Sequence, residues 1–316
     1  MIPFIAKRFG IGALLVLLVL TLIFSAIHLV PGDPAVLLLS SGNTSASPAA
    51  VAKLRDQLGL DQPLLTQYWQ FLHGVVRGDL GVSFRNGDAV TGSISSRLPR
   101  TLELILFATL ASMAIGIPLG AWAATRGGVV DNLATIVTSM GVALPVYVVG
   151  TLLILVFALT FGWFPAGGFA TLAQDPVKHL QIMVLPAASL SIGFTAIIAR
   201  MTRSAVLETM GQDWVRTAKS FGHSRLTVFR RHVLRNSMTP VTTVIGLGIG
   251  TLLGSTVLVE QVFNYPGLSS LLVESVANRD YPVVQGIVIV IAMIFIFINI
   301  VVDLIYGILD PRVRQS

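Results

Sequence analysis

The chain has 316 residues, of which 54% are hydrophobic and only 11% are charged, and its mean hydropathy is +0.81. These values argue against one large soluble core, in which apolar runs are shorter, and favour a polytopic helical membrane protein. The net charge is +6, but no pattern of basic and aromatic residues typical of nucleic-acid recognition is present, so we expect no nucleic-acid partner. The chain has no cysteine, which excludes disulfides, thiolate chemistry and cysteine-based metal sites.

The first apolar run follows Lys7 and Arg8 and extends to about residue 30. A cleaved signal peptide would have a shorter apolar region followed by a small-residue cleavage site, whereas "HLVPGDP" follows here. We therefore expect a retained first span, with its N-terminus in the cytoplasm.

Six apolar runs are long enough to cross about 30 Å of hydrocarbon. They are residues 9–30, 102–124, 133–160, 181–201, 238–260 and 283–307. If the N-terminus is inside, the cytoplasmic pieces carry about thirteen Lys and Arg against about four acids, whereas bases and acids are near balance outside. The six runs predict six transmembrane helices. The charge asymmetry predicts that both termini lie in the cytoplasm and that residues 31–100 form a large periplasmic segment.

The outer segment contains two signals for helix starts. Ser47 precedes Pro48, which predicts an N-cap and a first helical position. Asp61 precedes a run with apolar residues on one face, so we expect it to cap a second helix. Another short helix is expected after Pro266 and its following glycine. We expect these helices to pack on the outer ends of the spans, and a binding surface for an external partner is the alternative.

The sequence contains no catalytic set. None of the five His has another His or an acid at metal-ligand spacing, and there is no phosphate-cradling glycine-rich loop. We therefore expect a non-catalytic chain without a cofactor or a metal. The one ionisable residue well inside a span is Asp303, with Asn299 four residues earlier on the same helix face. The shallow depth of Asp303 favours a structural polar contact over a proton relay.

Residues 215–236, "VRTAKSFGHSRLTVFRRHVLRN", contain no acid. Their roughly six Arg and Lys would cost on the order of 15–20 kcal/mol at the centre of a bilayer. We therefore place segment 202–237 in the cytoplasm, as two short helices joined at Gly222. Trp214, Ala218 and Phe221 share one face of the first helix. Such helices lie on anionic lipid or dock into a groove of a partner, and the glycine break favours docking.

The run Arg216-Thr217-Ala218, followed by Gly222 and by "HVL" at 232–234, resembles the cytoplasmic "EAA-x-x-x-G" loop of ABC importer permeases. Arg216 stands where Glu is usual and Arg235 where Pro is usual, and both departures are typical of the dipeptide and oligopeptide branch. Further segments of that branch appear here in order: "HLVPGDP", "LGLDQP", "GDLGVSF", "RLPRTLEL", "RMTRSAVLE", "NRDYPVVQG" and "DLIYGILDPRVR". The chain is similar to the B-type permease subunit of these importers, a group whose features glutathione and nickel importers share.

The resemblance implies a single transmembrane permease domain over residues 1–316, with the type I ABC importer permease fold, in the bacterial inner membrane. It also implies a second homologous permease, two ATP-binding cassette subunits, and a periplasmic or lipid-anchored binding protein. The substrate would be a di- or oligopeptide, or alternatively glutathione, nickel or another small solute. A self-sufficient secondary transporter is the rival from another class, but neither internal repeats nor polar residues near mid-membrane are clear. A membrane-embedded hydrolase is disfavoured, because the sequence lacks the catalytic residues that such an enzyme requires.

In the family, the cytoplasmic loop forms a coupling helix that docks on the ATPase. By this resemblance Gly222 is a hinge, Ala218 allows close approach, and Trp214 and Phe221 fill the groove of the partner. Arg216 and Lys219, with Thr217 between them in the motif, would meet acids on the partner or phosphates of membrane lipid.

Overall fold

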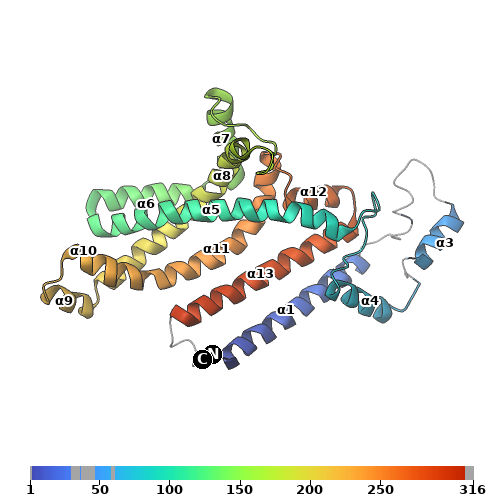
Figure 1. Cartoon of the computed structure of the whole chain (residues 1–316), viewed down its shortest axis with the longest axis horizontal. Coiled ribbons are helices and arrows are strands. Elements are labelled where there is room, and N and C mark those ends of the chain that lie inside the picture. The colour runs from blue at the N-terminus through green and yellow to red at the C-terminus, as the bar shows by residue number, and fades with distance from the viewer. Residues whose placement is uncertain (1, 30–35, 37–46, 58–60, 310–316) are drawn as a thin grey trace. The chain divides into compact units, whose positions relative to one another are not determined.

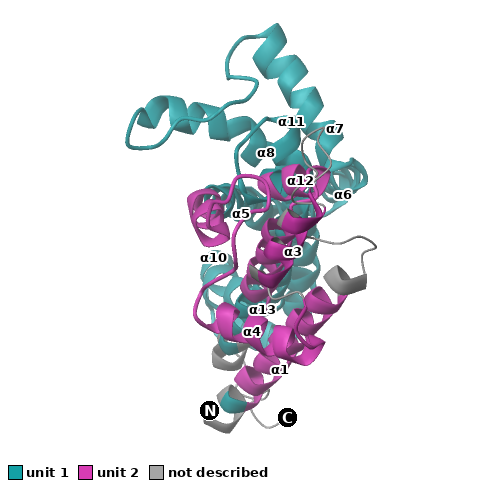
Figure 2. Cartoon of the chain, turned by 90° about the vertical axis from the view of Figure 1, so that its right-hand side faces the viewer, with its two compact units in different colours: residues 1–6, 100–270, 297–316 teal, residues 7–99, 271–296 magenta. Residues whose placement is uncertain are grey.

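A computed structural model describes residues 2–29, 36, 47–57 and 61–309 (Figure 1). Within these ranges the regular structure is helical, apart from one isolated antiparallel bridge between Val82 and Ala89. The chain divides into two compact units (Figure 2). The first holds the described residues of 1–6, 100–270 and 297–316, and the second holds those of 7–99 and 271–296.

Five helices in the described part of the chain are long and apolar enough to cross a membrane. They are formed by α1 (Ile2–Leu29), α5 (Val90–Arg126), α8 (Pro176–Met210), α10 (Arg225–Thr227) continuing into α11 (Arg235–Val262), and α13 (Tyr281–Leu309). These helices confirm five of the six expected spans.

The remaining expected span, residues 133–160, is broken. It consists of α6 (Gly128–Ala143), α7 (Val146–Leu153) and the π-helix η1 (Ile154–Thr160), and the two halves meet at a bend of 99°. The break lies at Leu144 and Pro145, where Leu144 is extended with φ −79° and ψ 124°. A proline disfavours the helical conformation of the residue before it, which ends α6 there. The structure therefore has five or six crossings, depending on whether the bent pair forms one span, compared with the six expected from the sequence.

Close packing between α5 and α8 holds the first unit together. A side chain on Gly116 would place its Cβ 2.9 Å from the carbonyl oxygen of Thr195, and a side chain on Gly120 would overlap the carbonyl of Ala199. The Ser112 hydroxyl also donates a hydrogen bond to the Ser191 carbonyl, 3.1 Å away. Small residues and interhelical hydrogen bonds are the usual means of helix association in membranes.

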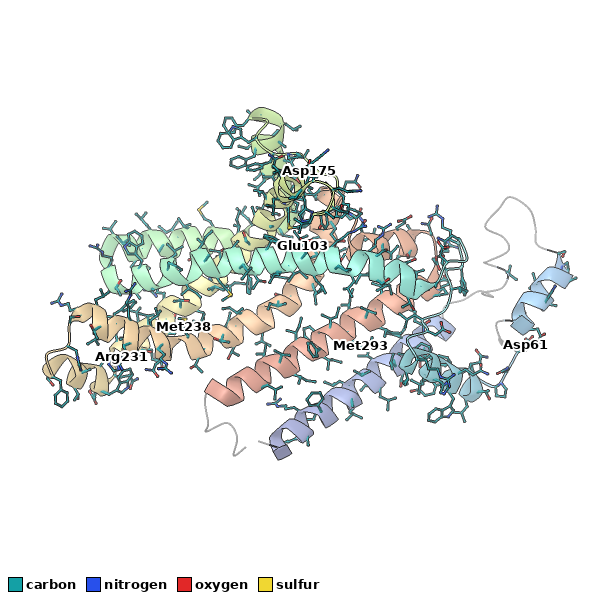
Figure 3. All side chains as sticks on the ribbon, viewed as in Figure 1. Asp61, Glu103, Asp175, Arg231, Met238 and Met293 are labelled. Atoms are coloured by element: carbon teal, nitrogen blue, oxygen red, sulfur yellow. The ribbon has the colours of Figure 1, made fainter. Side chains whose placement is uncertain are left out.

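The second unit contains α3 (Pro48–Gln57) and α4 (Leu64–Val76), and α12 (Leu268–Ala277) enters it from residue 271. Helix α3 begins at Pro48 and α12 begins soon after Pro266, as predicted. The expected cap at Asp61 was wrong, because α4 has Pro63 at its N-cap position and no side-chain cap. Asp61, labelled in Figure 3, pairs instead with Arg55 at 3.2 Å.

Asp280 links two segments of the second unit that are far apart in sequence. Its carboxylate accepts hydrogen bonds from the Ser83 hydroxyl at 2.5 Å and from the Phe84 N–H at 2.9 Å. Nearby, Arg85 pairs with Glu274 of α12 at 3.3 Å. These contacts fix the loop that follows α4 against the segment after α12.

Candidate functional site

The basic segment 202–237 is more helical than the sequence suggested. Helix α8 continues to Met210, and the helix that begins at Arg225 passes through the π-helix η2 (Val228–Leu234) directly into α11. Only a short connection remains between them, and it holds α9 (Asp213–Ser220) (Figure 1). The expected second short helix is therefore an extension of a span. Arginines do not end a helix, so the end of an apolar run was mistaken for the end of the helix.

A small apolar cluster anchors the inner face of α9. Its centre is Val215, which is fully buried. The other buried members of this anchoring cluster are Ala124, Val206, Val228 and Val233. Ala218 packs against the same cluster. The close approach that this small side chain allows is thus toward helices of its own chain, whereas we had expected it toward a partner. Val215 was not singled out from the sequence, although it lies three residues before Ala218 and therefore on a neighbouring part of the same helix surface.

Large apolar side chains remain exposed on the outer side of this segment. Trp214 is 42% exposed and Phe221 is 79% exposed, while Leu226 beyond the turn is 62% exposed. Arg216 makes only a loose, exposed ion pair with Asp213, at 3.5 Å. Exposed apolar side chains beside a cationic side chain such as Arg216 are usual in binding surfaces. This side of α9 therefore has the character of a docking face.

The part that two motif residues, Thr217 and Lys219, are expected to play in docking stays a prediction. The Thr217 hydroxyl donates to the carbonyl of Asp213, 3.1 Å away, within its own helix. The side chain of Lys219 lies outside the described residues.

Gly222 forms the joint between α9 and α10, as the spacing predicted. Its φ is +80°, in the left-handed region that favours glycine. Two residues later Ser224 caps the next helix, because its side-chain oxygen accepts the Thr227 N–H at 3.2 Å. Gly222 thus allows the turn between the two helices, and Ser224 caps the start of the second helix.

A groove of about 510 Å³ lies between the end of α8 and the beginning of α11. Its lining includes Glu208, Gln212, Trp214, His232 and Asn236. Figure 3 labels Arg231 and Met238, which lie along the helix that forms one wall of this region. Trp214 lines this groove, so its side chain belongs both to the docking face and to the groove.

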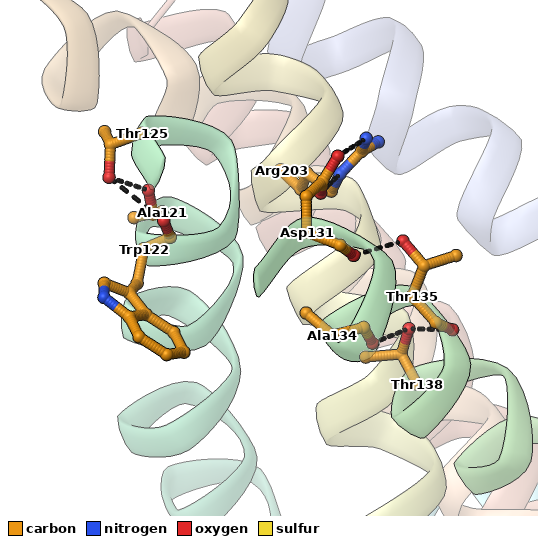
Figure 4. Close-up of polar contacts among 8 residues, drawn as sticks. All are labelled: Ala121, Trp122, Thr125, Asp131, Ala134, Thr135, Thr138 and Arg203. Carbon is orange, nitrogen blue, oxygen red and sulfur yellow. Dashed lines mark hydrogen bonds and ion pairs between the residues drawn. The ribbon is translucent and has the colours of Figure 1, made fainter. Parts of the chain in front are cut away.

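An ion pair ties α6 to α8. Arg203 donates two hydrogen bonds to the carboxylate of Asp131, and the one between Nη2 and Oδ2 measures 2.5 Å (Figure 4). On the next turn of α6, the Thr135 hydroxyl bonds the Asp131 carbonyl at 2.8 Å. The partners are 72 residues apart, and no local pattern in the sequence indicated them.

A buried carboxylate organises the other end of the first unit. Glu260 is fully buried at the end of α11, and it accepts hydrogen bonds from the Thr101 hydroxyl at 2.6 Å and the Ser270 N–H at 2.7 Å. Thr101 in turn accepts the N–H of Leu268 at 2.8 Å. Glu260 and Thr101 therefore satisfy the first free N–H groups of α12. Glu260 was not singled out from the sequence, because it ends an apolar run and its partner Thr101 is 159 residues away in the chain.

His179 and Glu103 form a second polar pair in this unit. His179 Nε2 lies 2.9 Å from the Glu103 carboxylate and Nδ1 lies 2.7 Å from the Ala170 carbonyl, so both ring nitrogens face acceptors. Figure 3 labels Glu103 near the middle of the view. Among the residues that the structure describes, no group of three or more His, Asp or Glu could hold a metal ion.

Aromatic groups close the region around this pair. The Arg100 guanidinium lies 4.1 Å from the ring centroid of Phe169, and Phe169 meets Tyr265 edge to face at 5.8 Å. Burial raises the pKa of the Tyr265 hydroxyl, and the nearby carboxylates of Glu103 and Glu260 raise it further. Tyr265 is therefore a neutral hydrogen-bond donor at physiological pH.

The intramembrane pair expected from the sequence is only partly described. Asn299 is half-buried on α13. The side chain of Asp303 lies outside the described residues. Its expected structural role therefore stays a prediction.

The long apolar helices and the bent pair define the class: the chain is an integral membrane protein. It belongs to the family of binding-protein-dependent transport system inner membrane components, whose model matches residues 116–315, while the N-terminal model of the same family matches residues 1–105. Members of this family are non-catalytic permease subunits of ABC importers in the bacterial inner membrane. The expectation of such a permease is confirmed.

Relatives match the chain over its whole length. A peptide transport system permease protein of Brucella abortus (strain 2308) is 39% identical over 100% of both chains. The dipeptide transport system permease protein DppB of Escherichia coli (strain K12) is 37% identical, also over 100% of both chains. Among solved structures, the inward-facing MetNI methionine ABC transporter has a chain that matches with a TM-score of 0.56 and 17% identity, over 69% of this chain and 96% of that one. This likeness confirms the type I importer fold.

Proposed function

We propose that this chain is one of two homologous permease subunits of an ATP-driven importer of di- or oligopeptides. The observation that carries the proposal is the full-length match, at 37–39% identity, to permeases named for peptide and dipeptide transport. Membership of the family implies a second permease, ATPase subunits and a substrate-binding protein. We infer two ATPases, one for each permease, and a binding protein that selects the peptide outside the membrane.

The proposed docking element for the ATPase is α9. Trp214 and Phe221 supply exposed apolar surface for a groove of the partner. Val215, on the inner side, fixes α9 to the anchoring cluster, whose other members come from α5, α8 and η2. Movement of the ATPase would therefore pass through α9 into helices that cross the membrane, as in a rigid-body transition between packed states.

The proposed topology has both termini in the cytoplasm and residues 31–100 on the periplasmic side. The excess of Lys and Arg in segment 202–237 supports it. Family matches that together reach from residue 1 to residue 315 support treating the chain as a single permease domain.

The experiment is reconstitution of the tagged chain with its co-expressed permease, ATPases and binding protein in proteoliposomes. We expect the ATPases to co-purify, and we expect ATP-dependent uptake of a labelled dipeptide. Uptake of glutathione or nickel without uptake of peptides would support the proposed importer but contradict the proposed peptide substrate. A chain that purifies without ATPases and transports alone would instead support a secondary transporter.

A further inference from the structure

We propose that α4 is a membrane anchor that lies in the plane of the outer lipid–water interface, with Leu65, Trp69 and Val76 inserted among the lipids. The occupant is the bilayer surface itself.

The first observation is that the apolar side of α4 is only half covered. Tyr68 and Phe71 pack on Phe24 of α1, with ring centroids 5.3 and 5.7 Å apart. The neighbouring strip of the same apolar side is open: Leu65 is 69% exposed, Trp69 is 62% exposed and Val76 is 85% exposed. These three recur at spacings of four and seven residues, which places them on one line along the helix.

The second observation is the polar character of the opposite side. Thr66, Gln70 and His73 are exposed there, and α4 contains no Asp, Glu, Lys or Arg. A helix with one polar and one apolar side has the amphipathic arrangement that lying in the interface requires. Since a tryptophan at the edge of the apolar side prefers the headgroup level, Trp69 fits the same location.

The third observation is a contact with a membrane-spanning helix. The Tyr68 hydroxyl lies 2.6 Å from the Thr21 hydroxyl of α1, so α4 meets α1 at Thr21 and Phe24. Both residues lie within the apolar window Ala6–Ser25 of α1, which is long enough to cross a membrane. Helix α4 thus packs against a helix that crosses the bilayer, and its open strip is within reach of lipid, as in an interfacial helix.

The fourth observation is continuity with a surface that must face lipid. Leu14, Leu18 and Leu22 on α1 are 64%, 50% and 61% exposed within the membrane-spanning window. Both strips belong to the same compact unit, and α4 contacts α1 at Thr21 and Phe24, on either side of Leu22 in the sequence. A bilayer would cover both strips, whereas a soluble protein would not reach the part of α1 inside the membrane.

The test uses the absence of native cysteine in the chain. Leu65→Cys, Trp69→Cys and Val76→Cys are each labelled with a nitroxide in the assembled transporter, in vesicles of phosphatidylethanolamine and phosphatidylglycerol. Gln70→Cys, on the polar side of the same helix, is the matched control. The transporter assembled with the unsubstituted, cysteine-free chain is the background control, because any label that it carries is on the other subunits. Electron paramagnetic resonance then compares collisions with oxygen, which concentrates in lipid, and with a water-soluble nickel chelate.

We expect the oxygen-to-nickel ratio to be several-fold higher at the three apolar positions than at Gln70. Three probes are used because one of them could disturb the local packing, and co-purification of the other subunits checks assembly. Equal, nickel-dominated ratios at all four positions would overturn the proposal and place this strip in water. Protection from both reagents at the apolar positions would also overturn it, because the strip would then be covered by a protein subunit.

Discussion

The carboxylate of Glu260 and the hydroxyl of Thr101 lie 2.6 Å apart, although 159 residues separate them in the chain. The pair joins the end of α11 to α5 and, through Leu268 and Ser270, to the start of α12. A buried carboxylate without its donors is costly, so these hydrogen bonds make Glu260 compatible with its fully buried position.

We expect Thr101→Val to destabilise the protein by about 1–3 kcal/mol, because it removes one donor to Glu260 and leaves the Leu268 N–H without an acceptor. The measurement is thermal unfolding of the purified transporter followed by circular dichroism. Thr151→Val is the matched control, since its hydroxyl bonds only to a carbonyl of its own helix and its surroundings are exposed. Equal melting temperatures for the two variants would show that the Glu260 contact contributes nothing.

Gly222→Val should abolish or strongly reduce peptide uptake while leaving membrane insertion intact. The φ of +80° costs a residue with a side chain about 1–2 kcal/mol, and more when the side chain is β-branched. The joint between α9 and α10 should therefore rearrange, and uptake in proteoliposomes should report it. Gly222→Ala should give an intermediate loss. Gly254→Ala, at a helical glycine with open space around its Cβ position, is the control and should transport normally.

Cysteine cross-linking separates the two sides of α9. Phe221→Cys should form a disulfide with a cysteine in the ATPase groove, because its side chain is 79% exposed, whereas Val215→Cys should not, because that position is fully buried. A disulfide needs Cα atoms within about 7 Å, so the yield reports close approach. Ala218→Cys should link poorly, since Ala218 packs on the anchoring cluster. Efficient linking at Ala218 together with none at Phe221 would reverse the proposed docking face.

The Asp131–Arg203 ion pair should show a small favourable coupling in a double-mutant cycle built from Asp131→Asn and Arg203→Gln. The value is modest because the two side chains are 19% and 31% exposed and thus partly screened by solvent. Unfolding temperatures of the four proteins give the cycle. Strictly additive effects would mean that the two side chains do not stabilise α6 against α8.

The topology is tested with two isosteric substitutions, Ser95→Cys and Ser224→Cys. A thiol reagent that does not cross membranes should label Ser95→Cys in intact spheroplasts and should label Ser224→Cys only after lysis. The reason is the positive charge of segment 202–237, which is retained on the cytoplasmic side. The opposite labelling pattern would invert the chain and remove the argument for ATPase docking.

Local patterns in the sequence predicted most of the fold. Apolar runs located five spans, the proline at position 48 located the start of α3, and Gly222 located a turn with positive φ. The size of the bend at Pro145 could not be predicted, because a proline inside an apolar run either bends or ends a helix and packing decides which. Asp61 does not cap α4, because Pro63 occupies the N-cap position of that helix.

The candidate site was predicted less completely. Motif spacing identified α9 and its joint, but helical periodicity alone could not tell which side of α9 its own chain would cover. Val215 and Ala218 face the anchoring cluster because α8 and the helix from Arg225 extend beyond the apolar runs and supply that cluster. The pairs Thr101–Glu260, Glu103–His179 and Asp131–Arg203 join residues 72 or more positions apart, beyond the reach of any periodicity argument.

The length of α8 sets a distance between the bilayer and the ATPase. Its 35 residues make a rod of about 52 Å, whereas the hydrocarbon of a bilayer is only about 30 Å thick. A helix that enters the membrane near its own start therefore projects well beyond the far headgroups. Helix α9 is carried at the tip of that projection, in open solution. In the proposed assembly, an ATPase would then engage α9 without touching lipid, and the arginines beside it would meet a protein surface instead of a phosphate layer.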